Sequence, residues 1–326
     1  MTKHRKVITI AELIIIALAS ICLVRSFKSE VSVGELRGIP YEAKQTQWSI
    51  GIYLGEAPFN FISPENVSNP VLTAKEVTDV PAAFVADPFM VRKNSTWYMF
   101  FEVMNTQTRQ GDIGLAISND GLNWVYRQIV LDEPFHLSYS YIVKWRNEHY
   151  MVPESCQANS IRLYKTIDFP TKWSLVGTLL YGNYVDPSVF HYKGRWWMFV
   201  ETNPEGNDIL RLYYADELIG PWIEHPESPI IEGDANIARP GGRVLIFEGR
   251  IIRYTQDDDP TYGNQVRAFE ITELTTSSYE EKEISESPIL KAEGTGWTAD
   301  GMHHIDPHQI HRDKWIACVD GCRQED

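Results

Sequence analysis

One pattern of residues recurs five times along the chain and restricts the folds open to it. Each copy starts with a polar residue, often followed by proline, and continues as an apolar strand, a turn and an aromatic-rich strand that ends in a carboxylate or amide. The copies start at Asp87, Tyr139, Asp186, Arg239 and Asp306, spaced 52, 47, 53 and 67 residues apart. Repeats of about 40–50 residues are typical of propeller blades, and β-branched and aromatic runs joined by tight turns predict antiparallel hairpins.

The two ends of the repeat region complement each other. The fifth copy lies so close to the C-terminus that it lacks the outer strands of a blade. We expect those strands near the N-terminus, where Trp48–Tyr53 resembles Asp112–Ile117 and Asn69–Leu72 resembles Ser228–Ile231. Such closure pairs sheet edges that would otherwise be exposed. The sequence therefore predicts an all-β, five-bladed β-propeller over residues 46–326, with an irregular β-sandwich as the alternative.

The first 28 residues have the composition of a membrane-targeting segment. A basic cluster at residues 3–6 precedes an apolar run of 18 residues, Val7–Val24, that only Glu12 interrupts. This length is just sufficient to cross a bilayer, and the basic cluster favours a cytoplasmic N-terminus. We expect residues 1–28 to form a short cytoplasmic stub and an uncleaved signal anchor, which is a transmembrane helix, and residues 29–45 to form a tether. A cleaved signal peptide is the alternative, and either puts the propeller on the extracytoplasmic side.

Composition narrows the choice of partners. The chain has 44 acidic and 30 basic residues and a net charge of −14 at pH 7. Such a surface repels phosphate backbones, so nucleic acid is not an expected partner, whereas neutral sugars and cations are. The charge would also serve solubility alone. Cys156, Cys318 and Cys322 are too few for a disulfide framework, although one bridge is possible.

The repeats also predict where a ligand would bind. The start of the first strand and the end of the second lie at the same end of an antiparallel hairpin. Two sets of side chains should therefore meet at one end of the propeller axis, which we call the mouth. The inner set is Asp87, Tyr139, Asp186, Arg239 and Asp306, and the set beside it is Glu102, Glu154, Glu201, Gln256 and Asp320. Crowded carboxyl groups raise one another's pKa, and glycosidic cleavage uses two carboxyls of different pKa. Alternatively, each Asp only hydrogen-bonds nearby backbone.

Two Asp-Pro strand starts and a run in the third repeat carry a family resemblance. They are Asp87-Pro88, Asp186-Pro187, and Tyr214–Trp222 with Ser228–Ile230, and they resemble the five-bladed arabinanase and xylosidase glycoside hydrolases of family 43. The resemblance implies that Asp87 is a general base and that Asp186 tunes the pKa of the general acid. The family's acid is a Glu at the start of the fourth blade, where this chain has Arg239, whose guanidinium stays protonated.

A more extensive resemblance begins at about residue 46. The runs that carry it are Arg239–Arg243, Tyr254–Asp257, Tyr262-Gly263, Val266–Phe269 and Gly296–His308. They are similar to the N-terminal domain of glucosamine inositolphosphorylceramide transferases. The resemblance implies a propeller that precedes a separate glycosyltransferase domain and assigns no catalytic residue to the propeller. Because the sequence ends at Asp326, we expect no transferase activity from it.

Arg239 and a histidine-rich segment leave alternatives open. The guanidinium of Arg239 either pairs with an Asp of the inner set or binds an anion such as a phosphoinositol headgroup. His304, Asp306 and His308 would share one face of a strand, so a divalent cation is an option, as is a cation on the propeller axis. We expect no required cofactor.

Two hypotheses of function follow. The first is an extracytoplasmic, glycan-active enzyme with Asp87 as base, Asp186 as modulator, and Glu154 or Glu201 as a relocated acid. The second is a non-catalytic module that binds a glycan or glycolipid headgroup near the membrane. In both, the further ligand contacts that we expect are Tyr139, Arg239, Asp306, His304, His308, Glu102, Gln256 and Asp257.

Overall fold

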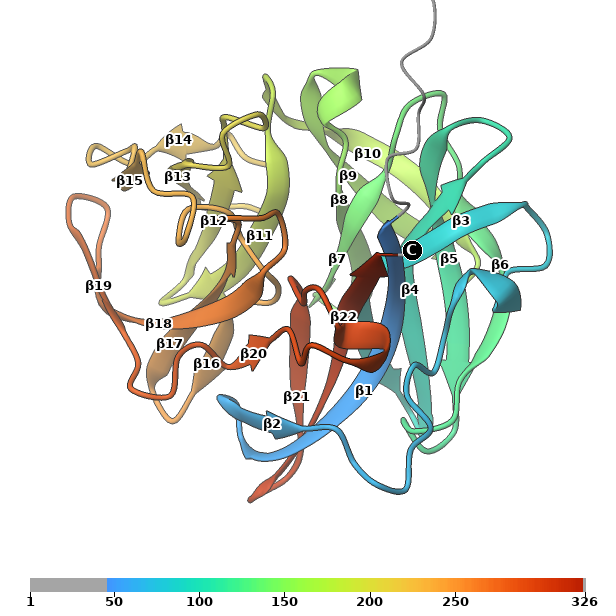
Figure 1. Ribbon diagram of the computed structural model, residues 1–326. Helices are drawn as coiled ribbons and strands as arrows, with labels where there is room; N and C mark the ends of the chain where they lie inside the picture. The colour runs from blue at the N-terminus through green and yellow to red at the C-terminus, as the bar shows by residue number, and fades with distance from the viewer. Residues whose placement is uncertain (1–45, 325–326) are drawn as a thin grey trace, which may run out of the picture. The chain divides into compact units, whose positions relative to one another are not determined.

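The computed structural model describes residues 46–324, which form a five-bladed β-propeller (Figure 1). Blade 1 consists of β3 (Ala82–Lys93), β4 (Thr96–Asn105), β5 (Gln110–Ser118) and β6 (Val125–Leu131). Blade 2 consists of β7 (Ser138–Trp145), β8 (Glu148–Glu154), β9 (Ser160–Asp168) and β10 (Lys172–Tyr181). Blade 3 consists of β11 (Val185–Tyr192), β12 (Arg195–Glu201), β13 (Ile209–Ala215), β14 (Ile223–Glu224) and β15 (Ile231–Glu232).

The last two blades follow the same order of strands. Blade 4 consists of β16 (Leu245–Phe247), β17 (Arg250–Asp257), β18 (Gln265–Leu274), β19 (Tyr279–Glu283) and β20 (Leu290–Lys291). Blade 5 consists of β21 (Ile305–His311), β22 (Lys314–Gln324), β1 (Thr46–Ala57) and β2 (Asn60–Ile62). The helical content of residues 46–324 is three short 3₁₀ turns, η1 (Ala74–Glu76), η2 (Cys156–Ala158) and η3 (Gly296–Thr298). The all-β prediction is confirmed.

Closure of the ring occurs in blade 5, where the two ends of the described chain meet. Strand β1 pairs with β22 in an antiparallel register that runs from Thr46↔Gln324 to Gly55↔Trp315, and Figure 1 shows the blue and red strands side by side. Strand β2 then forms the outer edge. The prediction that the N-terminal segment completes the last blade is therefore confirmed. The predicted anchor and tether, residues 1–45, lie outside the described residues, among which no helix is long and apolar enough to cross a membrane.

A proline-containing segment recurs at the outer side of three blades. In each, the residue before the proline accepts a hydrogen bond from the backbone N–H of the blade's third strand. The pairs are Asn69 Oδ1 with Ile52 (2.8 Å), Ser228 Oγ with Leu212 (2.9 Å) and Ser287 Oγ with Ala268 (3.3 Å). Three residues beyond Asn69 and Ser228, Leu72 pairs with Ile50 and Ile231 with Leu210. The predicted equivalence of the two segments is therefore correct.

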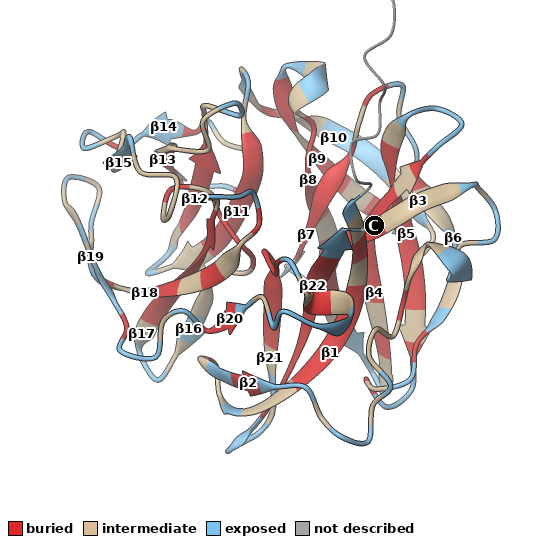
Figure 2. Cartoon of the chain, in the orientation of Figure 1, coloured by how far each residue is buried: buried red, intermediate tan, exposed pale blue. Residues whose placement is uncertain are grey.

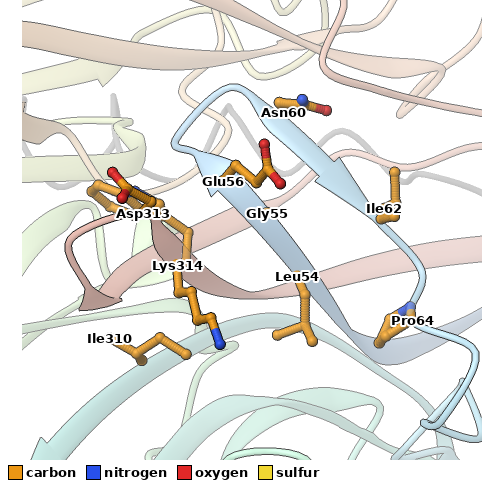
Figure 3. Close-up of a pocket in the computed structure, with 10 residues that line it drawn as sticks. Leu54, Gly55, Glu56, Asn60, Ile62, Pro64, Ile310, Asp313 and Lys314 are labelled. Carbon is orange, nitrogen blue, oxygen red and sulfur yellow. The ribbon is translucent and has the colours of Figure 1, made fainter.

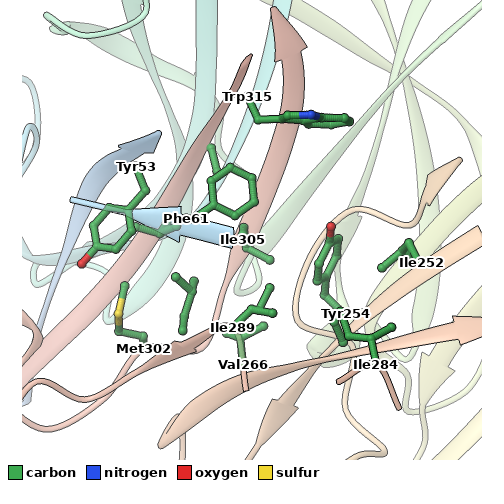
Figure 4. Packing of buried hydrophobic residues seen from close by; sticks show 14 residues of the cluster. Tyr53, Phe61, Ile252, Tyr254, Val266, Ile284, Ile289, Met302, Ile305 and Trp315 are labelled. Carbon is green, nitrogen blue, oxygen red and sulfur yellow. The ribbon is translucent and has the colours of Figure 1, made fainter. Parts of the chain in front are cut away.

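The hydrophobic core lies between neighbouring blades. Figure 2 shows buried residues along the middle of the strands and exposed residues at the outer edges and turns. In Figure 4, Tyr53, Phe61 and Trp315 of blade 5 pack against Ile252 and Tyr254 of blade 4. Burying such a side chain contributes roughly 1.5–3 kcal/mol, so packing between blades stabilises the ring in addition to the pairing of β1 with β22.

The three cysteines of the described chain are free thiols. Cys318 and Cys322 are buried in β22 and Cys156 is half-buried in η2. The Sγ of Cys318 donates to the carbonyl oxygen of Pro88. The bridge that the sequence left open does not form within residues 46–324.

Candidate functional site

The same backbone irregularity occurs in the inner strands of blades 1, 2 and 3. In β3, β7 and β11, two residues oppose a single residue of the neighbouring strand, which is the geometry of a β-bulge. Asp87, Tyr139 and Asp186 occupy these bulges with φ values of 50°, 43° and 51°. A left-handed conformation costs roughly 1–3 kcal/mol for residues other than glycine, and such strain concentrates at functional sites. The three bulges therefore make the mouth a candidate functional site.

A small cavity of about 210 Å³ opens at this mouth. Its acidic lining comes from Asp87, Glu102 and Glu154, and Arg239 is the arginine that lines it. The remaining lining residues are Trp48, Phe84, Ala86, His136, Ser138, Tyr262 and His303. We call it the axial cavity. Pockets for drug-sized ligands measure roughly 300–1,000 Å³, so this one has room for a single small ring.

Arg239 is held by groups of the protein itself. Its Nε lies 2.6 Å from Asp186 Oδ2, its Nη1 donates to Asn207 Oδ1 at 2.9 Å, and its Nη2 is 3.9 Å from Glu154 Oε2. The Gln256 amide also donates to Asp186 Oδ2, at 2.7 Å. Burial lowers the pKa of Arg239, but Asp186 outweighs it and raises the pKa well above its ordinary value. Of the two alternatives for Arg239, the structure shows pairing with an inner Asp.

Asp87 lies between two histidines and a second carboxylate. Its Oδ1 is 3.7 Å from both His303 Nε2 and His304 Nδ1, and its backbone N–H donates to Asp320 Oδ2 at 3.0 Å. Burial raises the pKa of Asp87 to about 7; His303 opposes this rise, whereas Asp186 and Asp320 add to it. With a pKa near neutral pH, this carboxyl can both donate and accept a proton, as an acid–base group must.

His303 is the cation beside Asp87. Its Nδ1 lies 2.7 Å from Asp320 Oδ1. Burial lowers the pKa of His303, but the carboxylates of Asp320 and Asp87 outweigh it and raise the pKa to about 9. The trio Asp87, His303 and Asp320 offers ligand atoms within 4.8 Å of one another, but the bond between His303 and Asp320 already uses one ring nitrogen for a proton. A divalent cation here stays a prediction.

Glu102 and Glu154 are the other acids of the cavity. Burial raises the pKa of both well above the ordinary value, and neighbouring carboxylates raise it further. Glu102 Oε1 is 3.4 Å from His136 Nε2, while His136 Nδ1 accepts the backbone N–H of Gly111 at 2.8 Å. This bond and burial, which lowers the pKa of His136, assign a neutral ring. Glu154 Oε2 is buried without a hydrogen-bond partner among the described residues.

Aromatic rings close the axis beneath the carboxylates. Tyr139 lies 4.9 Å from Phe89 and 5.3 Å from His304 between ring centroids. The Tyr139 hydroxyl accepts the N–H of Gly242 at 2.8 Å and lies 2.7 Å from Ser188 Oγ. Tyr139 and His304 were expected to contact the ligand, but both are buried in the floor, and neither lines the axial cavity. Burial lowers the pKa of His304 to about 4, so its ring is neutral.

The prediction that Asp306 belongs to the mouth is wrong. Asp306 pairs with Cys318 in a strand without a bulge at this point, so it occupies the level of Phe89 and not that of Asp87. Its carboxylate contacts Arg243 Nε, accepts the Met90 N–H at 2.5 Å and lies 2.9 Å from His308 Nε2. Burial raises the pKa of Asp306, but Arg243 outweighs it and holds the pKa well below its ordinary value. With its oxygens engaged in this way, Asp306 is unsuited to joining His304 and His308 around a metal.

Two further predicted residues lie away from the axial cavity. Glu201 is fully buried at the end of β12, where its Oε1 accepts the Asn203 N–H and its Oε2 has no partner among the described residues. Burial raises the pKa of Glu201 to about 7. Asp257 is paired with Arg267 at 2.8 Å. The structure thus brings together Asp87, Glu102, Glu154, Asp186, Arg239 and Gln256. Glu201 is close enough to Arg239 and Asp186 for both to affect its pKa but does not line the cavity, and Asp257, Asp306 and His308 are engaged elsewhere.

The aromatic wall of the cavity escaped the sequence argument. Trp48 stacks on His303 with ring centroids 4.0 Å apart, and Tyr262 meets both rings edge-on at 6.3 and 5.4 Å. Arg239 lies over the Tyr262 ring at 5.2 Å. Trp48 comes from the closing strand β1 and Tyr262 from the β17–β18 connection. Their place in the repeats carries no signal, because neither begins or ends a hairpin of the inner pair.

A larger cavity of about 550 Å³ lies on blade 5, between β2 and the β21–β22 turn (Figure 3). Leu54, Ile62, Ile310 and Trp315 give it a mainly apolar lining. Its ionisable residues, Glu56, Asp313 and Lys314, are all exposed. No buried acid or base lines it, so among the described residues the axial cavity is the better candidate for chemistry or for recognition of a polar ligand.

Comparison with known proteins defines the family. Residues 41–322 match the family described as glucosamine inositolphosphorylceramide transferase 1, N-terminal. The chain belongs to this family. Glucosamine inositolphosphorylceramide transferase 1 of Oryza sativa subsp. japonica is 37% identical over 297 residues, which cover 85% of this chain and 40% of the rice protein. The chain thus spans about two fifths of the length of that relative.

Solved structures agree with the fold of this glucosamine inositolphosphorylceramide transferase N-terminal domain. A β-1,2-mannobiose phosphorylase from Listeria innocua superimposes with a TM-score of 0.59 at 13% identity, covering 82% of this chain and 96% of that one. The catalytic domain of the family 62 α-L-arabinofuranosidase from Coprinopsis cinerea gives 0.53 at 11% identity, covering 85% and 98%. At these identities the likeness concerns the fold alone.

Proposed function

We propose that the axial cavity binds one sugar residue of a glycan or glycolipid headgroup and does not cleave it by the mechanism of the family 43 hydrolases. The aromatic wall of Trp48 and Tyr262 suits the apolar face of a sugar ring. The carboxyls of Asp87, Glu102 and Glu154 suit its hydroxyl groups. The observation that carries the proposal is this combination of a ring-sized cavity, an aromatic wall and buried acceptors at one mouth.

Arg239 argues against hydrolysis. It stands at the start of the fourth repeat, where the resemblance to family 43 expects the general acid, and its Nε is bound to Asp186 at 2.6 Å. A guanidinium cannot donate a proton at neutral pH. Asp186, which would tune the acid, is instead neutralised by the same residue. Both residues thus have a structural role in this domain.

Hydrolysis remains the second candidate because of one observation. Burial raises the pKa of Glu154 and Glu102 and brings that of Asp87 to about 7, so a protonated and an ionised carboxyl can coexist beside one cavity. Glu154 is the better of the two expected acids, because Glu201 does not line the cavity. Turnover would require Glu154 as acid and Asp87 as base.

The cellular setting belongs to the proposal as well. The basic and apolar residues of the first 28 positions support an anchored, extracytoplasmic propeller. The rice relative is named for a reaction on inositolphosphorylceramide, and a membrane-anchored propeller would meet such a headgroup at the bilayer surface. We therefore place a glycolipid headgroup ahead of a soluble glycan as the ligand.

The test is a titration of the full chain with a panel of monosaccharides and aryl glycosides. We expect saturable binding without release of the aryl group, and loss of at least about tenfold in affinity for Asp87→Asn. Asp313→Asn, an exposed change at the cavity on blade 5, is the matched control and should bind as the wild type does. Turnover that Asp87→Asn abolishes would establish hydrolysis instead, and absence of binding to every sugar would reject the proposal.

A further inference from the structure

The shape of the axial cavity limits how a sugar chain can enter it. We propose that the cavity accepts only a terminal sugar residue, which is joined to the rest of its ligand through a single bond, and that a residue inside a glycan chain cannot enter. The inference rests on the proposed sugar site and specifies the class of ligand that this site takes. It depends on the size of the cavity, on its closed floor and on the origin of its wall.

The size of the cavity admits one ring. The axial cavity measures about 210 Å³, less than half of the 550 Å³ of the cavity on blade 5. Pockets for drug-sized ligands measure roughly 300–1,000 Å³, so two linked sugar rings exceed the volume of the axial cavity. Any residue that is bonded to the bound ring therefore has to lie outside.

The floor of the cavity is closed. Phe89, Tyr139 and His304 are fully buried beneath it, and the ring centroids of Phe89 and His304 are 4.6 Å apart. These rings come from blades 1, 2 and 5, so they meet on the axis of the propeller. The Tyr139 hydroxyl connects the floor to the N–H of Gly242 and to Ser188 of β11. A sugar chain therefore cannot leave the cavity along the axis on the side away from the mouth.

Four blades contribute side chains to the wall of the cavity. They include Glu102 of blade 1, Glu154 of blade 2, Tyr262 of the β17–β18 connection in blade 4, and Trp48 of blade 5. A wall with these origins encloses the bound ring and does not form a groove that crosses the face of the propeller.

Blade 3 closes the remaining side indirectly. None of its residues lines the cavity, but Asp186 and Asn207 hold the guanidinium of Arg239, which does, at 2.6 and 2.9 Å. A residue inside a chain carries two glycosidic bonds, for example at C1 and C4 on opposite sides of its ring, so it needs two openings. A terminal residue needs one opening, which the mouth provides.

Tyr262 is the part of this wall that can be removed with little disturbance of the core. It is 46% exposed, whereas Trp48 is 6% exposed. Its ring packs edge-on against Trp48 and His303 from a connection between two strands. Truncation of Tyr262 should therefore open the cavity sideways to solvent and create the second opening that an internal residue needs.

The experiment is a calorimetric titration of the full chain at pH 7 with methylated D-glucose, D-mannose, D-galactose, D-xylose and L-arabinose. Each sugar is tested as the methyl glycoside, as the 4-O-methyl ether, and as the methyl glycoside of that ether, which imitates a residue inside a chain. An additional methyl group in a closed, packed space is unfavourable. We therefore expect one singly methylated form to bind at least about tenfold more tightly than the doubly methylated form of the same sugar.

Two variants test whether the wall causes this preference. In Tyr262→Ala the ratio of the two affinities should fall below about threefold, because the second methyl group can then point into solvent. Tyr181→Ala is the matched control and should keep the full ratio, since Tyr181 is 81% exposed and does not line the cavity. Melting temperatures close to that of the wild type show that both variants are folded. An unchanged ratio in Tyr262→Ala would contradict the role given to this wall.

Failure of the inference differs from failure of the proposed function. If a doubly methylated sugar binds as tightly as its singly methylated forms, the cavity accepts internal residues, so the inference is wrong and the sugar site stands. If none of the five sugars binds in any form, the proposed function fails with it.

Discussion

The inner strands of blades 1 and 5 carry the same dipeptide and use it in opposite ways. Asp87-Pro88 lies in a bulge of β3, with φ at 50° for Asp87, and the carboxyl faces the axial cavity. Asp306-Pro307 lies in regular register in β21, and its carboxyl is buried against Arg243. One extra residue in the strand therefore decides whether an aspartate faces a ligand or contributes to the interior of the ring.

The largest effect that we predict is on the buried pair of blade 5. Asp306→Asn leaves the Arg243 guanidinium without its carboxylate in the interior. Removing one partner of a buried pair costs about 3–5 kcal/mol, so chemical denaturation should report a loss of this size. Sugar binding per folded molecule should be unchanged. Unaltered stability would show that the two aspartates do not differ in the way described.

A double variant that restores the lost stability is the control for Asp306→Asn. In the double variant Asp306→Asn with Arg243→Met, no buried charge is left unpaired, so most of the lost free energy of unfolding should return. A double variant as unstable as Asp306→Asn would mean that the carboxylate acts through another contact, such as the Met90 N–H or His308.

A second, smaller effect is expected for the floor of the cavity. Tyr139→Phe removes the hydroxyl that accepts the Gly242 N–H at 2.8 Å and contacts Ser188. Leaving a buried donor unsatisfied costs about 1–3 kcal/mol, which urea denaturation can measure. If Tyr139→Phe is as stable as the wild type, the Gly242 N–H does not depend on the Tyr139 hydroxyl for its hydrogen bond.

Substitution of Asp87, the counterpart of Asp306 in blade 1, should lower sugar affinity and leave stability almost unchanged. Asp87→Asn keeps a residue type that tolerates positive φ and an oxygen that can accept the Tyr139 N–H. We expect the free energy of unfolding to change by less than about 1 kcal/mol, which is ordinary for a change without a cavity or a broken charge pair. Sugar affinity, measured by calorimetry on the same sample, should fall. An unfolded Asp87→Asn variant would make this aspartate structural, as Asp306 is.

The smallest effect concerns pH and Glu201. Its pKa is about 7 in the folded protein against an ordinary 4.5, so the folded state binds the proton more tightly than the unfolded state does. The stability from this proton is fully present below pH 4.5 and is lost as pH rises through 7. Melting temperatures of Glu201→Gln should therefore gain on the wild type between pH 5 and pH 8, whereas those of the exposed Glu205→Gln should follow the wild type. A constant difference across this range would contradict the shifted pKa.

The fold could be predicted because its signals are local and repeated. Each hairpin carries its own aromatic strand and turn, and the regular spacing of the five repeat starts predicted the number of blades. Six side chains of the site followed from their places in the hairpins, including Arg239 and Gln256. Asp306 did not, because nothing in an Asp-Pro dipeptide reveals whether the strand contains a bulge. Trp48 and Tyr262 did not, because they reach the mouth from a closing strand and a loop whose positions depend on ring closure.

A crystal structure of the full chain soaked with a monosaccharide that binds it in the titration tests the central claim most directly. The account predicts one sugar ring in the axial cavity, beside Trp48 or Tyr262, with hydroxyl groups at about 2.5–3.0 Å from carboxyl oxygens of Asp87, Glu102 or Glu154. Arg239 should stay bound to Asp186. A sugar bound in the cavity on blade 5, or an Arg239 released from Asp186 to contact the ligand, would contradict it.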